Sequence, residues 1–253
     1  MSPSLPLPLS TPDPQKEKEF AHRVRKMFAS IAPRYDLLNH LLSLGTDIYW
    51  RRATVGEVRS ILSRPGSRTL DLCCGTGDLT LALQRSAKGN KGAVLGADFC
   101  LPMLQMGEKK IRRASTVNPL LAADALDLPF AERTFDLVTS AFGFRNLASH
   151  QAGLREIFRV LKPGGEVALL EFSHVRTPIV GPLFRIYFRW VLPRLGAWLS
   201  GVEGPYKYLP DSVGRFPDQA QLRQMMRDCG FMSVRNRNFF GGVASLHRGR
   251  KPG

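Results

Sequence analysis

Arg68-Thr-Leu-Asp-Leu-Cys-Cys-Gly-Thr-Gly-Asp-Leu79 is the stretch that decides the fold of this 253-residue chain. Its first half is a short apolar run, typical of a buried strand, and its second half is a glycine turn that opens a helix. Asp71 lies inside the strand, while Gly75 and Gly77 form the turn. A strand, a glycine turn and a helix in this order predict a Rossmann-like sheet that binds a nucleotide-like cofactor at the turn.

The residues around the turn favour S-adenosylmethionine over a dinucleotide. A dinucleotide site has a third glycine where the helix packs beneath the pyrophosphate, and this chain has Thr80 there. Adenosylmethionine has no pyrophosphate, and its zwitterionic methionine and sulfonium need backbone donors and nearby carboxylates such as Asp71 and Asp78. Asp98 ends the next apolar strand, where an acid accepts the ribose hydroxyls. A glycine turn that binds no cofactor is the alternative.

Strand and helix patterns alternate through the middle of the chain, which predicts a parallel sheet. Strands are expected at 68–74, 92–98, 119–123, 135–141 and 165–172, with helices at 77–86, 101–114 and 151–161. Two later strand-like runs, 231–239 and 243–248, are joined by Gly241-Gly242, which marks a hairpin. We therefore predict an α/β fold with a mostly parallel, seven-stranded sheet that ends in an antiparallel hairpin.

The chain length fits one domain with appendages rather than two domains. Residues 1–15 are rich in proline and lack the flanks of a signal peptide, so we expect a disordered tail before a single domain at 16–253. A helix is expected to about Ile31, followed by a cap over the site at 31–52. No stretch of about 20 apolar residues occurs, which indicates a cytoplasmic protein, at most peripheral on the inner face of a membrane.

Residues 174–216 interrupt the alternation and are expected to form a lid that binds the substrate. They are rich in aromatic residues and arginines, and Arg185 and Arg189 share one helical face. Two interpretations stay open for this insertion. It is either a lid helix packed on the core with solvated arginines, or a helix that contacts a membrane.

The excess of charge predicts a polyanionic partner. The chain has 36 basic and 21 acidic residues, a formal net charge of +15. Such a charge is typical of proteins that bind nucleic acid or an anionic membrane surface, and charge alone does not choose between them. Four cysteines without a CxxC pair and five scattered histidines give no disulfide framework and no metal site, so no metal is expected.

Three stretches of the chain resemble a known family. They are Phe28-Ala-Ser-Ile-Ala-Pro-Arg-Tyr-Asp-Leu-Leu-Asn39 with Trp50-Arg-Arg52, Phe142-Gly-Phe-Arg-Asn-Leu147, and Arg159-Val-Leu-Lys-Pro-Gly-Gly165 with Leu170-Glu-Phe-Ser173. Together they resemble the UbiE/MenG/COQ5 family, whose members methylate a ring carbon in menaquinone and ubiquinone biosynthesis. The resemblance covers residue 16 to the end. It implies the class I adenosylmethionine-dependent methyltransferase fold, in which an antiparallel strand is inserted at the end of the sheet.

The resemblance also implies a cofactor site and a substrate. Thr76, Asp98, Asp124, Ala125 and Ser140 are implied to contact adenosylmethionine, and Ser140 is expected to end the fourth strand and face the crevice. The implied acceptor is a prenylated hydroquinone, demethylmenaquinol, which becomes menaquinol. A dual enzyme that also methylates 2-methoxy-6-polyprenyl-1,4-benzoquinol is the alternative. The acceptor must be the reduced quinol, because a quinone ring is too electron-poor to accept a methyl cation equivalent.

Arg145 is the expected catalytic residue. A guanidinium is a poor base, so we assign Arg145 to stabilising the quinol oxyanion or to positioning a water that acts as the base. The alternative is a lock on the carboxylate of a neighbouring loop. Asn146, Tyr206 and Tyr208 are expected to hydrogen-bond the quinol oxygens or, alternatively, backbone groups of the lid.

Other functions remain as alternatives. An RNA methyltransferase is disfavoured because the chain lacks an Asn/Asp-Pro-Pro-Tyr motif, so nucleic acid is not an expected partner. A different lipid methyltransferase and a non-catalytic peripheral membrane protein are more distant alternatives. The joint presence of Thr76, Asp98 and Asp124 argues against the last of these. An anionic membrane surface is expected as a transient partner, and a homodimer stays open.

Overall fold

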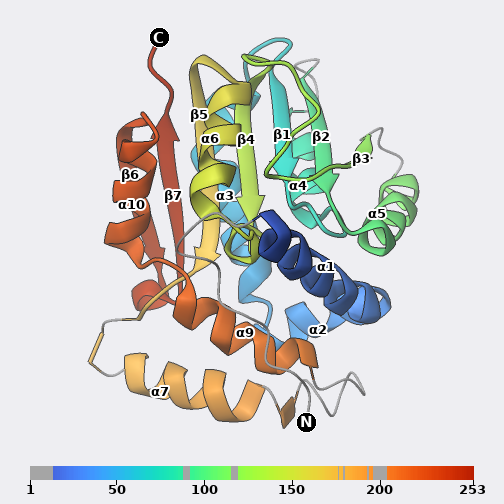
Figure 1. The fold of residues 1–253 in the computed structure, drawn as a ribbon, viewed down its shortest axis with the longest axis vertical. Coiled ribbons are helices and arrows are strands. Elements are labelled where there is room, and N and C mark those ends of the chain that lie inside the picture. Colours follow the sequence, from blue (N-terminus) through green and yellow to red (C-terminus); the bar gives the residue numbers. More distant parts are fainter. Residues whose placement is uncertain are drawn as a thin grey trace.

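A seven-stranded sheet forms the centre of the molecule (Figure 1). The computed structural model describes residues 14–87, 92–114, 119–175, 177–178, 180–192, 194–195 and 204–253. The strand order is β3-β2-β1-β4-β5-β7-β6, and β1 to β5 run parallel. The strands are β1 (Arg68–Leu72), β2 (Ala93–Asp98), β3 (Leu120–Ala122), β4 (Phe135–Ala141), β5 (Leu161–Phe172), β6 (Met232–Phe239) and β7 (Ala244–Arg250).

The C-terminal hairpin is the antiparallel part of the sheet, which confirms the predicted fold class. β7 pairs antiparallel with both β5 and β6, so it lies between them. Gly241 and Gly242 lie in the connection with φ of +68° and +103°, values that glycine adopts without steric strain. Most strand boundaries differ from the prediction by one or two residues, and the largest difference is in β5. It begins at Leu161 rather than at residue 165, because Phe135 already pairs with Leu161 before the glycine pair that follows.

Helices cover both faces of the sheet. The elements are α3 (Thr46–Leu62) and α4 (Asp78–Ala87) on one face, α6 (His150–Val160) and α10 (Gln219–Asp228) on the other, and α5 (Leu101–Arg113) beside β2 and β3. Side chains alternate between the two faces along β5. Val167 and Leu169 pack in the cluster with α6 and α10, whereas Ala168 and Leu170 pack in the cluster with α3 and α4.

A layer of helices lies beyond the carboxyl ends of the parallel strands (Figure 1). It contains α1 (Pro14–Ile31), η1 (Ala32–Arg34), α2 (Tyr35–Leu42), α7 (Val180–Ile186), the π-helical η3 (Tyr187–Val191) and α9 (Gly204–Arg215). The first helix and the cap at 31–52 are therefore where they were predicted. Residues 14 and 15, which we expected in the tail, are helical, and residues 1–13 lie outside the described part.

Candidate functional site

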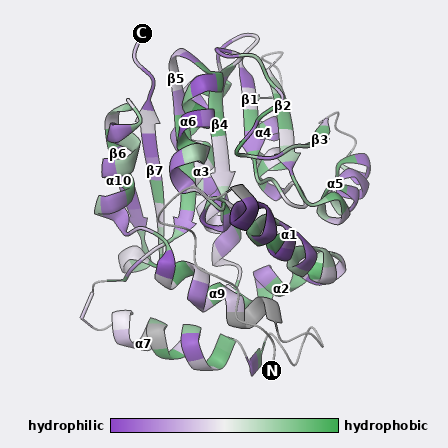
Figure 2. Ribbon diagram, in the orientation of Figure 1, coloured by the Kyte–Doolittle hydropathy of each residue, from purple (hydrophilic) through white to green (hydrophobic). Residues whose placement is uncertain are grey.

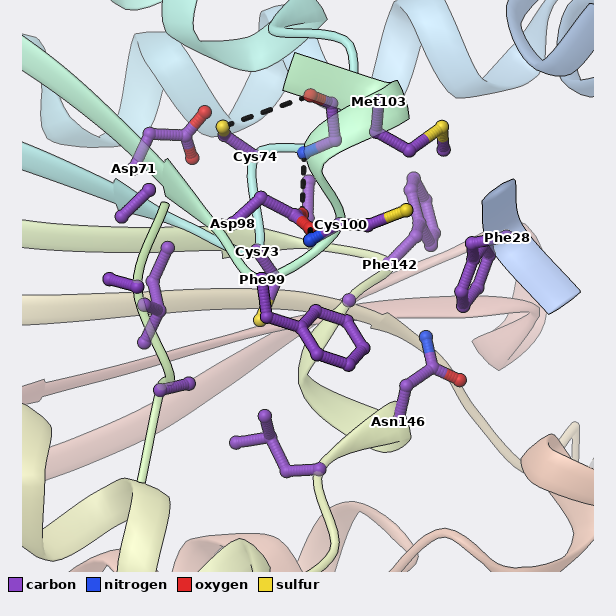
Figure 3. Close-up of a pocket in the computed structure, with 18 of the residues that line it drawn as sticks. Phe28, Asp71, Cys73, Cys74, Asp98, Phe99, Cys100, Met103, Phe142 and Asn146 are labelled. Carbon is purple, nitrogen blue, oxygen red and sulfur yellow. Dashed lines mark hydrogen bonds between the residues drawn. The ribbon is translucent and has the colours of Figure 1, made fainter. Parts of the chain in front are cut away.

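The glycine turn after β1 is fastened to the end of β2 by a carboxylate. The backbone N–H groups of Gly75 and Cys100 each donate to Asp98, at 2.8 Å to its two oxygens. Asp98 is 8% exposed, and burial raises the pKa of its carboxyl group to about 6 even though backbone donors lower it. Figure 3 shows this carboxylate directed at the turn, with Phe99 and Asn146 on the other side of the pocket.

Asp71 joins three elements instead of standing free in the pocket. Its two oxygens accept hydrogen bonds from the hydroxyl groups of Thr80, at 2.6 Å, and Thr139, at 2.9 Å. The carboxyl group is fully buried, which raises its pKa to about 6, while the two hydroxyl donors lower it. The threonine that replaces the third glycine of a dinucleotide site therefore serves as a partner for Asp71, tying α4 to β1 and β4.

The ends of β1 and β4 approach each other very closely. Cys73 and Phe142 both have a positive φ, +53° and +61°, a conformation that costs energy for residues other than glycine. A Cβ atom on Gly143 would lie 2.3 Å from the Cβ of Cys73, so only glycine fits there. Backbone strain of this kind is concentrated at functional sites, and Cys73, Phe142 and Gly143 all line the cavity described next.

The first cavity, which we call the cofactor pocket, opens at the carboxyl edge of the sheet. It brings most of the predicted cofactor residues together, and its lining includes Asp71, Gly75, Thr76, Asp98, Asp124, Ala125 and Asn146. Gly77 shapes the turn, since its N–H donates to the carbonyl of Cys74 at 2.9 Å. Ser140 does not line the cavity. It is buried inside β4 with its hydroxyl unpartnered, one residue before Ala141, which does line the cavity.

An ion-pair network closes one side of this pocket. The ammonium group of Lys110 lies 2.6 Å from a carboxylate oxygen of Asp36 and 2.5 Å from one of Asp78. The Thr76 hydroxyl donates to Asp36 at 2.5 Å and accepts from Lys110 at 3.1 Å. The cap helix α2 is thus tied to the glycine turn. Sequence reasoning missed Lys110, because nothing in its local pattern distinguishes it from the other basic residues of α5.

A second cavity, the apolar cavity, lies beneath the cap and the insertion. Aromatic and aliphatic side chains form most of its wall, among them Phe28, Leu42, Trp50, Phe142, Phe172, Phe184, Phe188 and Leu192. Four residues border both cavities: Phe28, Tyr35, Arg51 and Phe142. The two cavities are therefore adjacent, with empty volumes, including their open mouths, of about 970 and 1260 Å³.

Arg145 borders the apolar cavity, and it is paired with a carboxylate. Its Nη1 donates to Glu171 at 2.9 Å and to the carbonyl oxygen of Phe142, and its Nε donates to Ser212 at 3.4 Å. The Arg145 backbone N–H donates to the other oxygen of Glu171 at 3.0 Å. Both side chains are buried, with 6% and 1% exposure. Arg145 is therefore held by a carboxylate, as in the alternative, but this carboxylate belongs to strand β5 and not to a neighbouring loop. Arg145 lies at the wall of the apolar cavity.

Asn146 and Tyr208 link the two cavities. The Tyr208 hydroxyl donates to the side-chain oxygen of Asn146 at 3.1 Å, and Asn146 lines the cofactor pocket while Tyr208 lines the apolar cavity. Burial raises the pKa of Tyr208 to about 12, which makes this phenol a hydrogen-bond donor rather than a base. The side chain of Tyr206, predicted beside it, lies outside the described part of the structure.

Arg51 is a second guanidinium, at the boundary between the two cavities, and the sequence analysis assigned it no role. It is ion-paired with the buried Asp47 one helical turn earlier, and its guanidinium carbon lies 5.5 Å from the centroid of the Phe142 ring. Tyr35 borders the same place, and burial raises the pKa of its phenol. The only sequence signal was the position of Arg51 within the Trp50-Arg-Arg52 match.

Solved structures share this architecture at low sequence identity. A "SAM dependent methyltransferase from Aquifex aeolicus" aligns with a TM-score of 0.57 at 18% identity, covering 78% of this chain and 88% of that one. The "[4+2]-Cyclase SpnF" aligns with a TM-score of 0.64 at 17% identity, covering 90% and 95%. The fold is that of class I S-adenosylmethionine-dependent methyltransferases.

Sequence comparison identifies the family to which the chain belongs within this fold class. The model of the ubiE/COQ5 methyltransferase family matches residues 15–251, and the chain belongs to this family. A "Demethylmenaquinone methyltransferase" of Thermus thermophilus is 47% identical over 89% of this chain and 100% of that protein. Proteins of the same name from Deinococcus radiodurans and Staphylococcus aureus are 46% and 39% identical, over 90% and 94% of this chain and 92% and 96% of theirs.

Among the described residues, no group of three or more His, Cys, Asp or Glu side chains is arranged to hold a metal ion. In the same part of the chain, no helix is both long enough and apolar enough to cross a bilayer. The expectation that no metal takes part stays a prediction.

Proposed function

We propose that the protein methylates a ring carbon of demethylmenaquinol, using S-adenosylmethionine as the methyl donor, to give menaquinol. The observation that carries this proposal is the contact between the two cavities. A pocket with several carboxylates at the glycine turn meets an apolar, aromatic cavity at Phe28, Tyr35, Arg51 and Phe142. Methyl transfer requires a donor and an acceptor held against each other away from water, and the relatives that carry this name support the choice of acceptor.

The cofactor pocket fits adenosylmethionine. Asp98 uses each oxygen for one backbone N–H donor, and a carboxylate oxygen has further lone pairs to accept ribose hydroxyls. Asp124 and Ala125 follow β3 on the same edge of the sheet, where the adenine would lie. Gly75, Thr76 and Gly77 would hold the methionine end, and the unpartnered hydroxyl of Ser140 lies one residue from the wall. When bound, the cofactor supplies an electrophilic methyl group on a sulfonium.

The apolar cavity fits the quinol ring and the start of its prenyl chain. Its wall has two guanidiniums, Arg51 and Arg145, each held by a buried carboxylate. A guanidinium has five N–H donors, and Arg145 uses its side chain for three hydrogen bonds, so donors remain for a phenolate oxygen. In this low-dielectric cavity the guanidiniums stabilise the ionised quinol, whose ring carbon is then nucleophilic enough to take the methyl group.

The remaining residues position the acceptor. The Tyr208 hydroxyl is bonded to Asn146, so the Asn146 amide is oriented where the cavities meet. Its N–H₂ group is a donor for the second quinol oxygen. After transfer, the methylated ring carbon loses its proton to solvent or to a neighbouring acceptor, so one proton is released for each methyl group transferred. No covalent bond to the protein is required.

Methyl transfer from labelled adenosylmethionine to chemically reduced demethylmenaquinol, in detergent, tests this function. The oxidised quinone is the control, and the 2-methoxy-6-polyprenyl-1,4-benzoquinol is the second acceptor. Label on menaquinol alone supports the proposal, and label on both acceptors would establish the dual enzyme. Cofactor binding without label on either acceptor would overturn the quinol assignment.

A further inference from the structure

Large apolar side chains are exposed at one end of the molecule. All but three of those exposed in the described part of the chain belong to α2, the turn before α3, the start of α3, the α7–η3 helix with the residues after it, and η4 (Phe240–Gly242). The exceptions are Leu101, Leu121 and Met232. We call the group the cap face, and it consists of Leu37, Leu41, Leu44, Ile48, Tyr49, Ile186, Trp190, Val191, Leu195 and Phe240.

These side chains form one surface because their elements pack on one another. Leu38 and Leu42 of α2 form a buried cluster with Phe188 and Leu192, so the exposed neighbours of these residues lie on adjoining helices. The Tyr187 hydroxyl also donates to the carbonyl of Leu42 at 2.6 Å. In Figure 1, α2 and α7 lie at the end of the molecule opposite the C-terminus, and Figure 2 shows hydrophobic turns along α7.

Part of the cap face borders the apolar cavity. Leu44 is 84% exposed and Phe240 is 54% exposed, and both line that cavity. The Tyr49 and Phe240 rings lie 6.0 Å apart, which extends the surface onto α3. Exposed apolar side chains are therefore found both on the outside of the molecule and at the wall of the space proposed for the quinol. A group of exposed apolar side chains of this kind marks an interaction site.

The charges on the segments of the cap face indicate which kind of partner binds there. Arg52, Arg189 and Arg194 are exposed, and residues 180–195 contain no acidic residue. The two acids of residues 31–52 are both ion-paired, Asp36 with Lys110 and Asp47 with Arg51. The apolar face thus has a basic border. Apolar side chains bordered by arginines are the composition with which interfacial helices bind anionic lipid surfaces.

We propose that the cap face docks on an anionic lipid bilayer, so that the apolar cavity opens directly into the lipid that contains the acceptor. This inference rests on the proposed function, since a prenylated quinol is dissolved in the bilayer. Ile186 enters the interface from α7 and Trp190 from η3, and Leu37 and Leu41 enter from α2. The quinol ring then reaches Arg145 while its prenyl chain stays in the membrane.

Sedimentation with vesicles tests the docking without any quinol. The wild-type protein is expected to bind phosphatidylglycerol/phosphatidylcholine vesicles and to bind pure phosphatidylcholine much less. The variant Leu37→Glu with Ile186→Glu should lose affinity by about tenfold or more, because two inserted side chains become charged. The matched control is Leu101→Glu with Met232→Glu, two residues of similar exposure, 58% and 59%, outside the cap face. Equal losses in the two variants, or no vesicle binding by the wild type, would overturn the proposal.

A second pair of variants tests the basic border. Arg52→Gln with Arg189→Gln should lower affinity for anionic vesicles by about thirtyfold, the equivalent of about 2 kcal/mol, and leave binding to neutral vesicles unchanged. The control, Arg64→Gln with Arg85→Gln, removes two exposed arginines from α4 and the segment before β1. Equal effects of the two pairs would contradict the assignment of the border.

Two measurements separate this proposal from its competitors. Methyl transfer to a short-chain, water-soluble demethylmenaquinol in the absence of vesicles should be the same in the Leu37/Ile186 variant and the wild type. With long-chain quinol in vesicles, methyl transfer by the Leu37/Ile186 variant should be slower than methyl transfer by the wild type. If no quinol is methylated but vesicle binding follows the cap face, the proposed function fails and the docking stands. A concentration-dependent dimer that Leu37→Glu with Ile186→Glu dissociates would assign the face to a second copy of the chain and overturn the docking.

Discussion

The Nη1 atom of Arg145 lies 2.9 Å from Oε2 of Glu171, and both side chains are almost completely buried. Glu171 also accepts the backbone N–H of Arg145 at 3.0 Å and that of Phe172 at 3.2 Å. The carboxylate therefore fixes both the backbone and the guanidinium of Arg145. Removing one partner of such a pair leaves an uncompensated charge in a low-dielectric interior.

We expect Glu171→Gln and Arg145→Gln each to lower the free energy of unfolding by about 3 to 5 kcal/mol, the usual cost of breaking a buried ion pair. The double variant should cost much less than the sum, because it leaves no buried charge. Urea denaturation of the four proteins, analysed as a double-mutant cycle, measures the difference. Additive losses would mean that the pair does not couple the two residues.

Turnover should depend on Arg145 separately from stability. In the double variant Arg145→Gln with Glu171→Gln, kcat for the quinol should fall by about a hundredfold or more, the scale of a lost oxyanion donor. Affinity for adenosylmethionine, measured by calorimetry, should change little, because Arg145 borders the apolar cavity and not the cofactor pocket. An equal loss of cofactor affinity would contradict the catalytic assignment.

The contact between the ends of β1 and β4 predicts an unusually sensitive glycine. Gly143→Ala should destabilise the protein by about 1 to 3 kcal/mol, because the new methyl group would overlap the Cβ of Cys73. The matched control is Gly56→Ala on α3, where a Cβ would meet nothing within 4 Å. That change should stabilise the helix by up to about 1 kcal/mol. Thermal unfolding measures the stability of both variants. A Gly143→Ala variant as stable as the wild type would mean that the ends of β1 and β4 can move apart.

The sheet was predictable from sequence, because each strand carries its own local signal. The glycine turn, the alternating apolar runs and the Gly241-Gly242 pair are short-range patterns, and together they specify the order of strands and helices. The main departure is the start of β5 at Leu161. The Lys-Pro-Gly-Gly segment that follows reads as a turn, yet here it lies within a bulged strand.

The site was only partly predictable, because its contacts join residues far apart in the chain. Asp98 and Thr76 carry a local motif, so sequence reasoning placed them in the cofactor pocket. Glu171 and Lys110 carry no such motif, and only the packing of β5 and α5 brings them to Arg145 and Thr76. Ser140 differs from the expectation only in where it lies, because its side chain is buried inside β4 and the next residue, Ala141, lines the pocket. Its contact with the cofactor stays a prediction.

Binding of adenosylmethionine should depend on pH through Asp98. Burial raises the pKa of this carboxyl group to about 6 in the folded protein, and only the ionised form accepts two ribose hydroxyls while keeping its bonds to Gly75 and Cys100. Affinity should therefore be constant above about pH 7 and fall as the pH drops through about 6.

The raised pKa of Asp98 has the opposite effect on the stability of the ligand-free protein. A carboxyl group with a raised pKa contributes stability that is fully present below the unfolded value of 3.8 and is lost as the pH rises through about 6. Raising the pH from 4 to 7 should thus weaken this group's contribution to folding while it strengthens binding. Calorimetry and urea denaturation across this range measure the two trends. Asp98→Ala should weaken binding by about 1.5 to 3 kcal/mol at pH 7, flatten the binding profile and reduce the slope of the folding profile, to which Asp71 still contributes. Asp228→Ala, a change at the exposed end of α10, should do none of these. A wild-type affinity that stays constant down to pH 5 would exclude an ionised Asp98 as the acceptor.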